Sequence, residues 1–471
     1  MQDKVKTRPG PFRQPYAGYH LRHDRSRAEV DVELTHCGPG TPMGETMRRA
    51  WQPVCLSEEL TDVPKAIRIM NEDLVAFRDR GGRVGVLARH CPHRGASLEF
   101  GIVQERGIRC CYHAWQFDVD GSILEMPCEP ADSRMKDNLC IGAYPAFERH
   151  GLVFAYLGDP ATIPPFDEFD AYHLPAGGRL VAFSNIYPCN WLQVHENLVD
   201  HFHAAALHNN MTVASVDRAI SDGVSLGQGF RTMPLVRWET TRDGHGLMFA
   251  AARRVNDDRV WIRITEMTLP NLCHTSSVAP SAAEQRHTTV GMTRWHVPVD
   301  DHHMISFGWR HFNDEIDPAH FGREDACGVD RVDFLAGQVG DRSYREGQLA
   351  PGDFEAITSI GTIAPHSLEH PGHSDLGVNL CRSLLRRLVR GETPPDTTRA
   401  KARAAGDTLP LYSCDSVLHL PRRDDADDAE LLSATGRRML ELIREIDALP
   451  SGERQAHMRR RLDELDGGGR V

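Results

Sequence analysis

Apolar and polar residues alternate along the first third of the chain with the period of two that is typical of half-buried β-strands. After Trp51, short segments of this kind are separated by turn residues such as those at 71–73 and 81–82. The segments lie at 66–70, 74–77, 84–87, 108–117 and 152–156. The pattern predicts a small antiparallel β domain. Loops at the tip of such a sheet can form a site, because hairpin ends bring together residues that are distant in sequence.

The second half of the chain mixes strand and helix periodicity and predicts a larger mixed domain. Strand-like segments lie at 180–185, 230–236, 246–252, 260–268 and 288–296. Helical periodicity occurs at 191–208 and 376–390. A capping-box sequence at 427–430 predicts another helix, whose apolar face would consist of Leu432, Met439, Ile443 and Ile446. The expected fold class is therefore α+β.

Turn-forming residues divide the chain into four expected parts. Residues 1–40 are polar and irregular and predict an extended arm. A helix start at Thr41-Pro42 opens a β domain over 41–160, and a Pro-rich stretch at 160–175 marks its end. The larger domain would occupy 161–400, and a helical extension with a frayed Gly-rich tail from Asp463 would occupy 401–471.

Composition and charge restrict the classes of function that the chain can have. The 471 residues are 40% apolar and 25% charged, which is the balance of an ordinary globular protein, and the net charge of −12 argues against a nucleic-acid-binding surface. There is no long apolar run and no apolar segment near Met1, so we expect a cytoplasmic protein without a membrane partner. The 12 cysteines are scattered, which favours reduced thiols and a metal site over a disulfide framework.

Two short Cys/His groups in the β domain supply metal ligands. They are Cys91-Pro-His93 and Cys110-Cys-Tyr-His113. Two thiolates and two imidazoles at these spacings match a Rieske [2Fe–2S] cluster, in which one iron takes both Cys and the other both His. Cys110 is preferred to Cys111, because only Cys110 gives a two-residue gap before the histidine. A tetrahedral zinc site uses the same residue types and is the alternative.

A second group of potential ligands lies in the predicted helix 191–208. Asp200, His203 and His208 form an Asp-x-x-His-x4-His pattern, and two imidazoles with a carboxylate can hold Fe(II) with open positions for dioxygen and substrate. His195 and His201 are rival ligands. On a regular helix, residues five apart are about 140° apart around the axis, so we expect the helix to end or widen between His203 and His208.

These motifs resemble the α subunits of the Rieske non-haem iron oxygenases, in the phthalate dioxygenase and aromatic O-demethylase branch. The loop at 91–96 fits the family pattern, and the loop at 109–115 departs from it at Cys111, where Pro is usual, and at Ala114, where Gly is usual. The resemblance covers about 41–390. It implies a small all-β Rieske domain beside a larger catalytic domain of helix-grip (START-like) type.

The resemblance also implies roles for two carboxylates. The segment that starts at Asp353, eight residues before Gly361, resembles the segment that supplies the family's carboxylate ligand to the iron. Asp353 is therefore the expected third iron ligand, with Glu355 as the fallback. Asp200 is instead expected to hydrogen-bond a histidine at each metal and so to connect the Rieske centre of one subunit with the iron of its neighbour in a homotrimer.

The activity implied by the family is that of a terminal oxygenase. It would use O2 and electrons from NADH to hydroxylate an aromatic compound, with an aromatic carboxylate as the expected substrate and ring hydroxylation and oxidative O-demethylation both open. The chain has no Gly-x-Gly-x-x-Gly fingerprint, so a separate flavin/iron–sulfur reductase, with or without a ferredoxin, must supply the electrons. A substrate carboxylate would pair with an arginine. The candidates are Arg231, Arg237, Arg253, Arg254 and Arg294.

A non-catalytic Rieske-type electron-transfer protein is the principal alternative function, and a zinc-dependent hydrolase is a more distant one. Iron content separates the first alternative from the oxygenase. The oxygenase would hold about three iron atoms per chain and the carrier about two.

Overall fold

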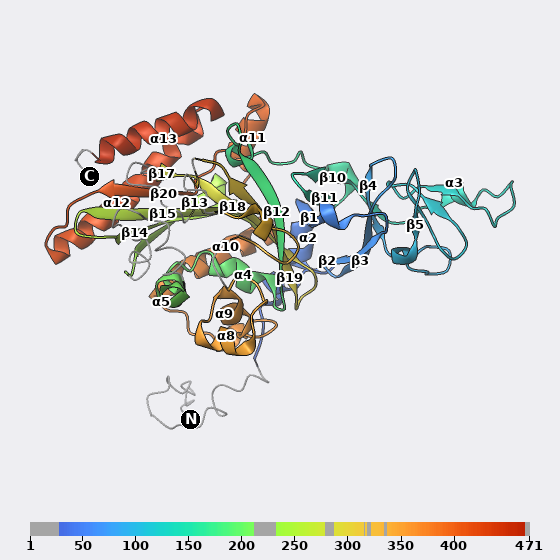
Figure 1. Ribbon diagram of the computed structural model, residues 1–471, viewed down its shortest axis with the longest axis horizontal. Coiled ribbons are helices and arrows are strands. Elements are labelled where there is room, and N and C mark those ends of the chain that lie inside the picture. The colour runs from blue at the N-terminus through green and yellow to red at the C-terminus, as the bar shows by residue number, and fades with distance from the viewer. Residues whose placement is uncertain are drawn as a thin grey trace, which may run out of the picture.

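A computed structural model describes residues 28–211, 232–277, 287–314, 316–317, 322–333 and 337–466. The small β-sheets of the N-terminal half lie at one end of the molecule, and the large sheet with its helices lies at the other (Figure 1). The prediction of an α+β protein, with a small all-β domain beside a larger mixed domain, is confirmed.

The N-terminal half contains three antiparallel sheets. The first has the order β2-β3-β4-β9, the second β1-β11-β10 and the third β5-β6-β7-β8. Their bounds are β1 Trp51–Leu56, β2 Lys65–Ile69, β3 Glu72–Arg78, β4 Val84–Ala88, β5 Ile102–Val103, β6 Ile108–Arg109, β7 Gln116–Phe117, β8 Ile123–Glu125, β9 Ala143–Tyr144, β10 Ala146–Arg149 and β11 Leu152–Tyr156. Helix α2 (Pro42–Arg48) precedes them, and the Thr41 hydroxyl accepts a hydrogen bond from the Gly44 N–H, as predicted for an N-cap.

The larger region is built on one nine-stranded sheet. Seven strands follow the order β12-β19-β18-β16-β15-β14-β13, and β20 pairs with both β15 and β17. The bounds are β12 Arg179–Tyr187, β13 Leu235–Thr241, β14 Gly246–Arg254, β15 Arg259–Thr268, β16 Leu272–Ser276, β17 His287–Thr288, β18 Val290–Pro298, β19 Met304–Phe312 and β20 Cys414–His419. All of its pairings are antiparallel.

Helices cover both faces of this sheet (Figure 1). On one side lie α4 (Trp191–Asn197), α5 (Phe202–Met211), α9 (Asp353–Thr358) and α10 (Leu376–Val389), and on the other lie α12 (Asp425–Glu445) and α13 (Ser451–Asp466). Successive side chains of a strand point to opposite faces. On β15, Ile262 and Ile264 therefore belong to the core under α12, while Arg263 and Thr265 point to the α4–α5 side.

Several element predictions need correction. The helix expected over 191–208 is two helices, α4 and α5, with a break at 198–201. The capping box predicted at 427–430 does not start a helix, because α12 already begins at Asp425 with Asp424 as its N-cap. Asp463 does not open a frayed tail, because α13 continues to Asp466. The strand expected over 230–236 begins only at Leu235, and Arg231 lies outside the described residues.

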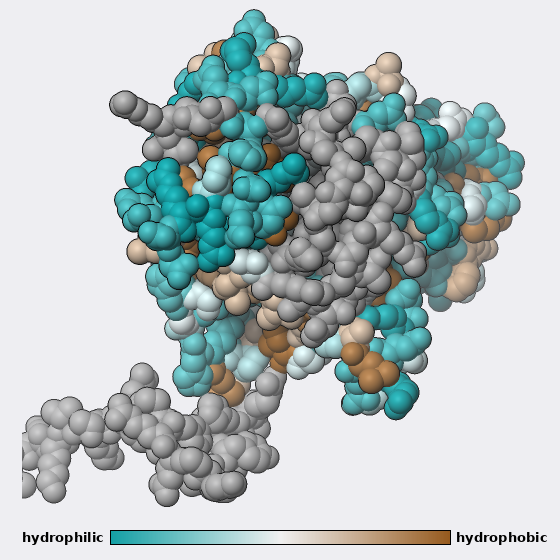
Figure 2. All heavy atoms as spheres, turned by 60° about the vertical axis from the view of Figure 1, so that its left-hand side comes forward, coloured by the Kyte–Doolittle hydropathy of each residue, from teal (hydrophilic) through white to brown (hydrophobic). Residues whose placement is uncertain are grey.

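The surface over the C-terminal half is mainly hydrophilic. On the face drawn in Figure 2, apolar residues form small patches among polar ones in the described part of the chain. No described helix is both long enough and apolar enough to cross a membrane. The expected arm includes a short helix at its end, α1 (Val32–Thr35), while its first 27 residues lie outside the described part.

Candidate metal centres

The two Cys/His groups form adjacent loops in the N-terminal half. The first follows β4, and the second connects β6 to β7. Each loop is closed by the same pair of backbone hydrogen bonds: Cys91 N–H donates to Ala96 O and Gly95 N–H to Cys91 O, as Cys110 N–H donates to Trp115 O and Ala114 N–H to Cys110 O. The chain thus presents two cysteines from matching positions of two similar loops.

The second loop has the same backbone conformation as the first at the position where it departs from the family pattern. Gly95 has φ +76°, and Ala114, at the matching position, has φ +59°. Both are left-handed conformations, which favour glycine. The loop therefore keeps the backbone shape that a glycine would give. Cys111 is exposed, whereas Cys110 is buried like Cys91, so only Cys110 is placed to share a metal with Cys91.

The donor set fits an iron–sulfur cluster with mixed ligands. The His93 and His113 rings lie beside each other, with centroids 4.5 Å apart, and His93 stacks on the buried Trp115 at 4.7 Å. The His113 Nδ1 atom is buried and has no hydrogen-bond partner in the described part of the chain, so it is available as a metal ligand. Burial raises the pKa of Cys91 to about 11, so a metal is needed to keep it a thiolate at neutral pH.

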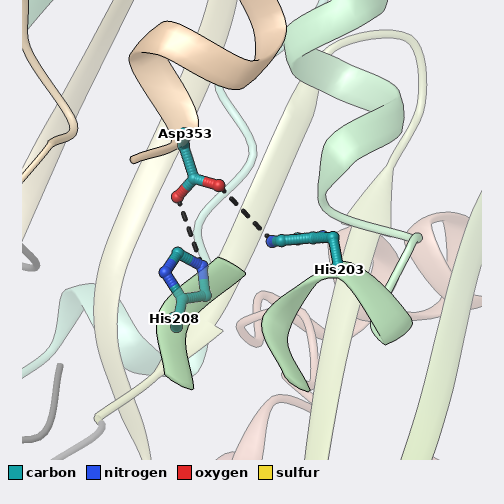
Figure 3. Close-up of side chains that lie close together, drawn as sticks. All are labelled: His203, His208 and Asp353. Carbon is teal, nitrogen blue, oxygen red and sulfur yellow. Dashed lines mark ion pairs between the residues drawn. The ribbon is translucent and has the colours of Figure 1, made fainter. Parts of the chain in front are cut away.

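The second group of ligands meets where α5 faces the start of α9. His203 Nε2 lies 3.4 Å from one carboxylate oxygen of Asp353, and His208 Nε2 lies 3.4 Å from the other (Figure 3). The ligand atoms of the three residues lie within 4.8 Å of one another, and among the described residues no other group of at least three His, Cys, Asp or Glu side chains converges this closely. Two imidazoles and one carboxylate on one side of a cavity suit a mononuclear iron with open positions.

The helix does not end or widen between the two histidines, so that expectation was wrong. α5 is a regular α-helix from Phe202 to Met211. The imidazoles nevertheless approach each other, with ring centroids 5.2 Å apart, and both Nε2 atoms point to Asp353 (Figure 3). The length of the side chains closes the gap that helical geometry leaves between the two Cα positions.

Two side-chain amides hold the Asp353 carboxylate. Asn197 Nδ2 donates to Oδ1 at 3.2 Å, and Gln338 Nε2 donates to Oδ2. Burial alone would raise the pKa of Asp353, but the attraction of His208 and His203 and these two amides hold it below its usual value. The carboxylate is therefore kept charged and oriented, as a metal ligand must be.

A cavity opens from this group toward the sheet. Its wall combines apolar side chains, including Phe249 and Ile357, with Arg263 and Arg294. Arg263 forms an ion pair with Asp415, with Nη1 3.4 Å from Oδ2. Arg294 forms no ion pair within the described part of the chain, and its side chain donates one hydrogen bond, to the Thr275 hydroxyl. The cavity therefore contains a buried guanidinium without an acidic partner.

Comparison with known proteins identifies the family. Residues 50–145 match the family model described as Rieske [2Fe-2S] domain, and residues 187–326 match that of the vanillate O-demethylase oxygenase C-terminal domain. The tert-butanol monooxygenase / tert-amyl alcohol desaturase oxygenase subunit of Aquincola tertiaricarbonis is 58% identical over 96% of both chains. This chain belongs to the Rieske non-haem iron oxygenases.

Two further matches are less similar. The phenoxybenzoate dioxygenase α subunit of Ectopseudomonas oleovorans is 36% identical and covers 76% of this chain and 84% of its own. The solved structure of dicamba monooxygenase bound to dicamba is 20% identical, with a TM-score of 0.53 over 73% of this chain and 98% of its own, and it supports the fold. The predictions of a Rieske oxygenase, of its fold and of its [2Fe–2S] and non-haem iron cofactors are confirmed.

The alternative iron ligands and most of the candidate substrate-binding arginines of this Rieske oxygenase interact with other residues. His195 is fully buried with its Nδ1 3.1 Å from Nδ1 of His296, and His201 contacts the Arg253 guanidinium. Glu355 pairs with Arg342 and accepts the Gly352 N–H. Of the other arginine candidates, Arg254 pairs with Asp428 and Arg237 is half exposed beside Glu239.

Asp200 caps helix α5 in the subunit. Its Oδ1 accepts the N–H groups of Phe202 (3.2 Å) and His203 (3.4 Å), and its carbonyl oxygen accepts from His203 Nδ1. Because this contact engages Nδ1 of the His203 ring, the other nitrogen, Nε2, faces Asp353. The carboxylate also lines a surface cavity beside Glu196 and Glu369.

Proposed function

We propose that Cys91 and Cys110 hold one iron of the Rieske cluster and that His93 and His113 hold the other. The support is the matched pair of loops, the buried thiols and the adjacent imidazoles. His203, His208 and Asp353 hold the mononuclear iron, and the support is the convergence of their ligand atoms. When bound, the cluster would pass on single electrons and the iron would activate dioxygen.

The side chains around the iron site have distinct tasks. Asn197 and Gln338 fix the Asp353 carboxylate, and the Asp200 carbonyl fixes the tautomer of His203 by accepting its Nδ1 proton. Apolar residues such as Phe249 and Ile357 limit water in the cavity. The Asp200 carboxylate is the proposed link to a neighbouring subunit in a homotrimer. Figure 1 supports this assembly, because β5–β8 and α5 lie well apart along the molecule.

The substrate that we propose first is a small tertiary alcohol, on which the subunit would act by hydroxylation or desaturation. The observation that carries this proposal is the 58% identity with the tert-butanol monooxygenase / tert-amyl alcohol desaturase subunit over 96% of both chains. The other reported relative is much less similar, at 36% identity. A compact alcohol also suits the cavity, which measures about 80 Å³, below the range of about 300–1,000 Å³ that is usual for ligand sites.

An aromatic carboxylate, the substrate expected from the sequence, is the second candidate. Arg294 favours it, because a buried guanidinium without an acidic partner is an anchor for a carboxylate. The printed names of more distant relatives also point to aromatic acids, as in phenoxybenzoate and phthalate dioxygenases. On this alternative, hydroxylation of a ring or removal of an O-methyl group would follow.

The electrons are proposed to come from NADH through a separate reductase. Relatives are named as oxygenase subunits or as iron–sulfur subunits of monooxygenase systems, which supports a multi-component enzyme. A complete iron site argues against the alternative of a non-catalytic electron-transfer protein, because a carrier has no use for it.

A product assay tests the substrate. The purified subunit, a surrogate Rieske reductase, NADH and O2 are incubated with tert-butanol, tert-amyl alcohol, benzoate or phthalate, and products are identified by mass spectrometry. We expect oxygenated or desaturated products from the two alcohols, which the Asp353→Ala variant does not form. Products from the aromatic acids alone would instead support the second candidate, and their loss in Arg294→Gln would confirm its anchor.

A further inference from the structure

A second cavity, of about 260 Å³, lies where the N-terminal sheets meet the large sheet. It is enclosed by the end of α2 and the start of β1, by the linker residues 164–172, by the turn between β15 and β16, and by α11 (Thr397–Ala405). None of its lining residues belongs to the iron cavity. It is larger than the iron cavity and has no part in the oxygenase chemistry described above.

The two cavities lie on opposite faces of the large sheet. Arg294 and Trp295 are consecutive residues of β18, and consecutive side chains of a strand point to opposite faces. Arg294 lines the iron cavity and Trp295 lines the second one. On β15, Thr265 lines the iron cavity, and Thr268, which is three residues further along and so on the opposite face, lines the second cavity. A ligand in the second cavity would therefore be separated from the iron by the sheet.

The inner wall of the second cavity is rich in aromatic rings. Trp51, Phe166, Tyr172 and Trp295 all contribute to it. The Trp51 Nε1–H already donates to Pro164 O at 2.8 Å, and Tyr172 and Trp295 pack against each other with ring centroids 6.5 Å apart. Walls of this kind favour a flat apolar group, because aromatic pairs stack or meet edge to face.

The rim of the cavity carries more positive than negative charge. Arg49 is exposed and, within the described part of the chain, has no ion-pair partner. Arg399 and Arg403 both pair with the carboxylate of Asp167, at 3.1 and 2.9 Å, and Arg399 also pairs with Asp396 at 3.5 Å. Guanidinium groups bind carboxylates through charge-assisted hydrogen bonds. The rim therefore offers Arg49 as an unused anion-binding group.

One polar group inside the cavity wall also lacks a partner. Thr268 is 3% exposed, and its Oγ1 atom is buried without a hydrogen bond to any described residue. Buried hydroxyls are normally paired, since an unmade hydrogen bond costs free energy. The hydroxyl is an independent indication that a polar ligand atom or an ordered water completes this wall.

We propose that the cavity is a second ligand site of the subunit and that it binds a small aromatic carboxylate. The ring would lie against Trp51, Phe166 and Trp295, and the carboxylate would lie at the rim beside Arg49. The site is separate from the place of oxidation, so the proposal does not depend on which substrate the iron site takes.

Isothermal titration calorimetry on the purified holoprotein, with benzoate as the probe, tests the proposal. We expect saturable binding in the wild type and in Arg294→Gln, which alters only the iron cavity. Arg49→Gln should weaken binding about tenfold, the usual effect of losing a hydrogen bond to a charged group. Arg345→Gln, at an exposed arginine of α8 (Tyr344–Leu349) away from the cavity, is the matched control and should bind like the wild type.

A second variant and a second probe separate charge from shape. Ala50→Phe places a ring in the cavity and should prevent benzoate binding without removing a charge. Benzyl alcohol, which keeps the ring but lacks the carboxylate, should bind more weakly than benzoate. The proposal is overturned if the wild type shows no saturable binding at millimolar benzoate, if neither Arg49→Gln nor Ala50→Phe weakens it, or if only Arg294→Gln abolishes it.

Discussion

Ala114 shows how one residue can depart from a family pattern while the loop keeps its shape. Its φ of +59° is the left-handed conformation that glycine adopts without strain. For an L residue this conformation costs about 1 kcal/mol. The cluster loop therefore stores a small strain at the position after His113.

Replacing Ala114 with glycine should relieve that strain. We expect Ala114→Gly to stabilise the holoprotein by about 1 kcal/mol. The melting temperature, monitored through the loss of the cluster absorbance on heating, measures the effect. Gly95→Ala is the matched control, because φ is +76° there and an added Cβ would meet nothing within 4 Å. It should destabilise by a similar amount, and unchanged melting of both variants would contradict the loop assignment.

The residues that we propose as metal ligands were predictable, but the contacts that orient them were not. Cys91, His93, His203 and His208 stand at spacings that the chemistry of the metal requires. The contacts of Gln338 and Asn197 with Asp353 could not be read from spacing, because an amide that donates to a carboxylate can come from any part of the chain that the fold brings near. Only the convergence of α4, α9 and the segment before α9 places them at Asp353.

Gln338 should matter for the mononuclear iron alone. We expect Gln338→Ala to weaken iron binding at that site by about 10–100-fold, the usual effect of losing a partner of a metal ligand, and to leave the cluster spectrum unchanged. Iron retained after dialysis against a chelator measures this. Gln348→Ala, at an exposed position of α8, is the control. Equal iron retention in both variants would remove Gln338 from the site.

At the scale of elements, the break between α4 and α5 forms the site. It lets Asp200 act as the N-cap of α5, so the residue that begins the helix also orients His203. Sequence periodicity could not locate this break, because apolar and polar residues continue through 198–201 without a Pro or Gly. Strands β2, β3, β4, β11, β12, β14, β15 and β18 were predicted, because each coincides with a strand-like segment of the sequence. Strands β16, β19 and β20 were not predicted from the sequence.

Two substitutions separate the capping role of Asp200 from its proposed role in electron transfer. Asn is as good an N-cap as Asp, so Asp200→Asn should keep both metals and the stability of the protein. It should nevertheless block transfer from the reduced cluster to the iron in a single turnover, measured by stopped-flow absorbance with substrate and O2. Asp200→Ala should in addition cost about 1 kcal/mol of stability. Normal single-turnover transfer in Asp200→Asn would refute the link between subunits.

At the scale of the whole molecule, the core contains histidines whose pKa is lowered by burial. His195 and His311 are 0% and 1% exposed, and burial lowers the pKa of each to about 3. His274 and His296 are also fully buried, and burial places their pKa well below the usual value. His274, His296 and His311 belong to strands of the large sheet and His195 to α4, and all four are neutral in the folded state near pH 7.

The free energy of unfolding should therefore fall in acid. Below about pH 6.5 the unfolded chain binds protons at these four histidines and the folded chain does not, so stability is lost as pH decreases toward 3. At pH 5.5 the loss amounts to about 5 kcal/mol, comparable to the total stability of many proteins. Melting temperatures between pH 7.5 and 5.5 measure it. His311→Gln should flatten the dependence and His302→Gln, at an exposed site, should not. A melting temperature independent of pH would contradict this account.

The central claim is that one chain holds both a Rieske cluster and a separate iron, bound by the residues named above. Iron and acid-labile sulfide, determined per chain in the anaerobically purified wild type and in His208→Ala, test it most directly. The account predicts about three irons and two sulfides in the wild type, and about two irons with two sulfides and an unchanged cluster spectrum in the variant. Zinc in place of iron, an absence of sulfide, or the same iron content in both proteins would contradict it.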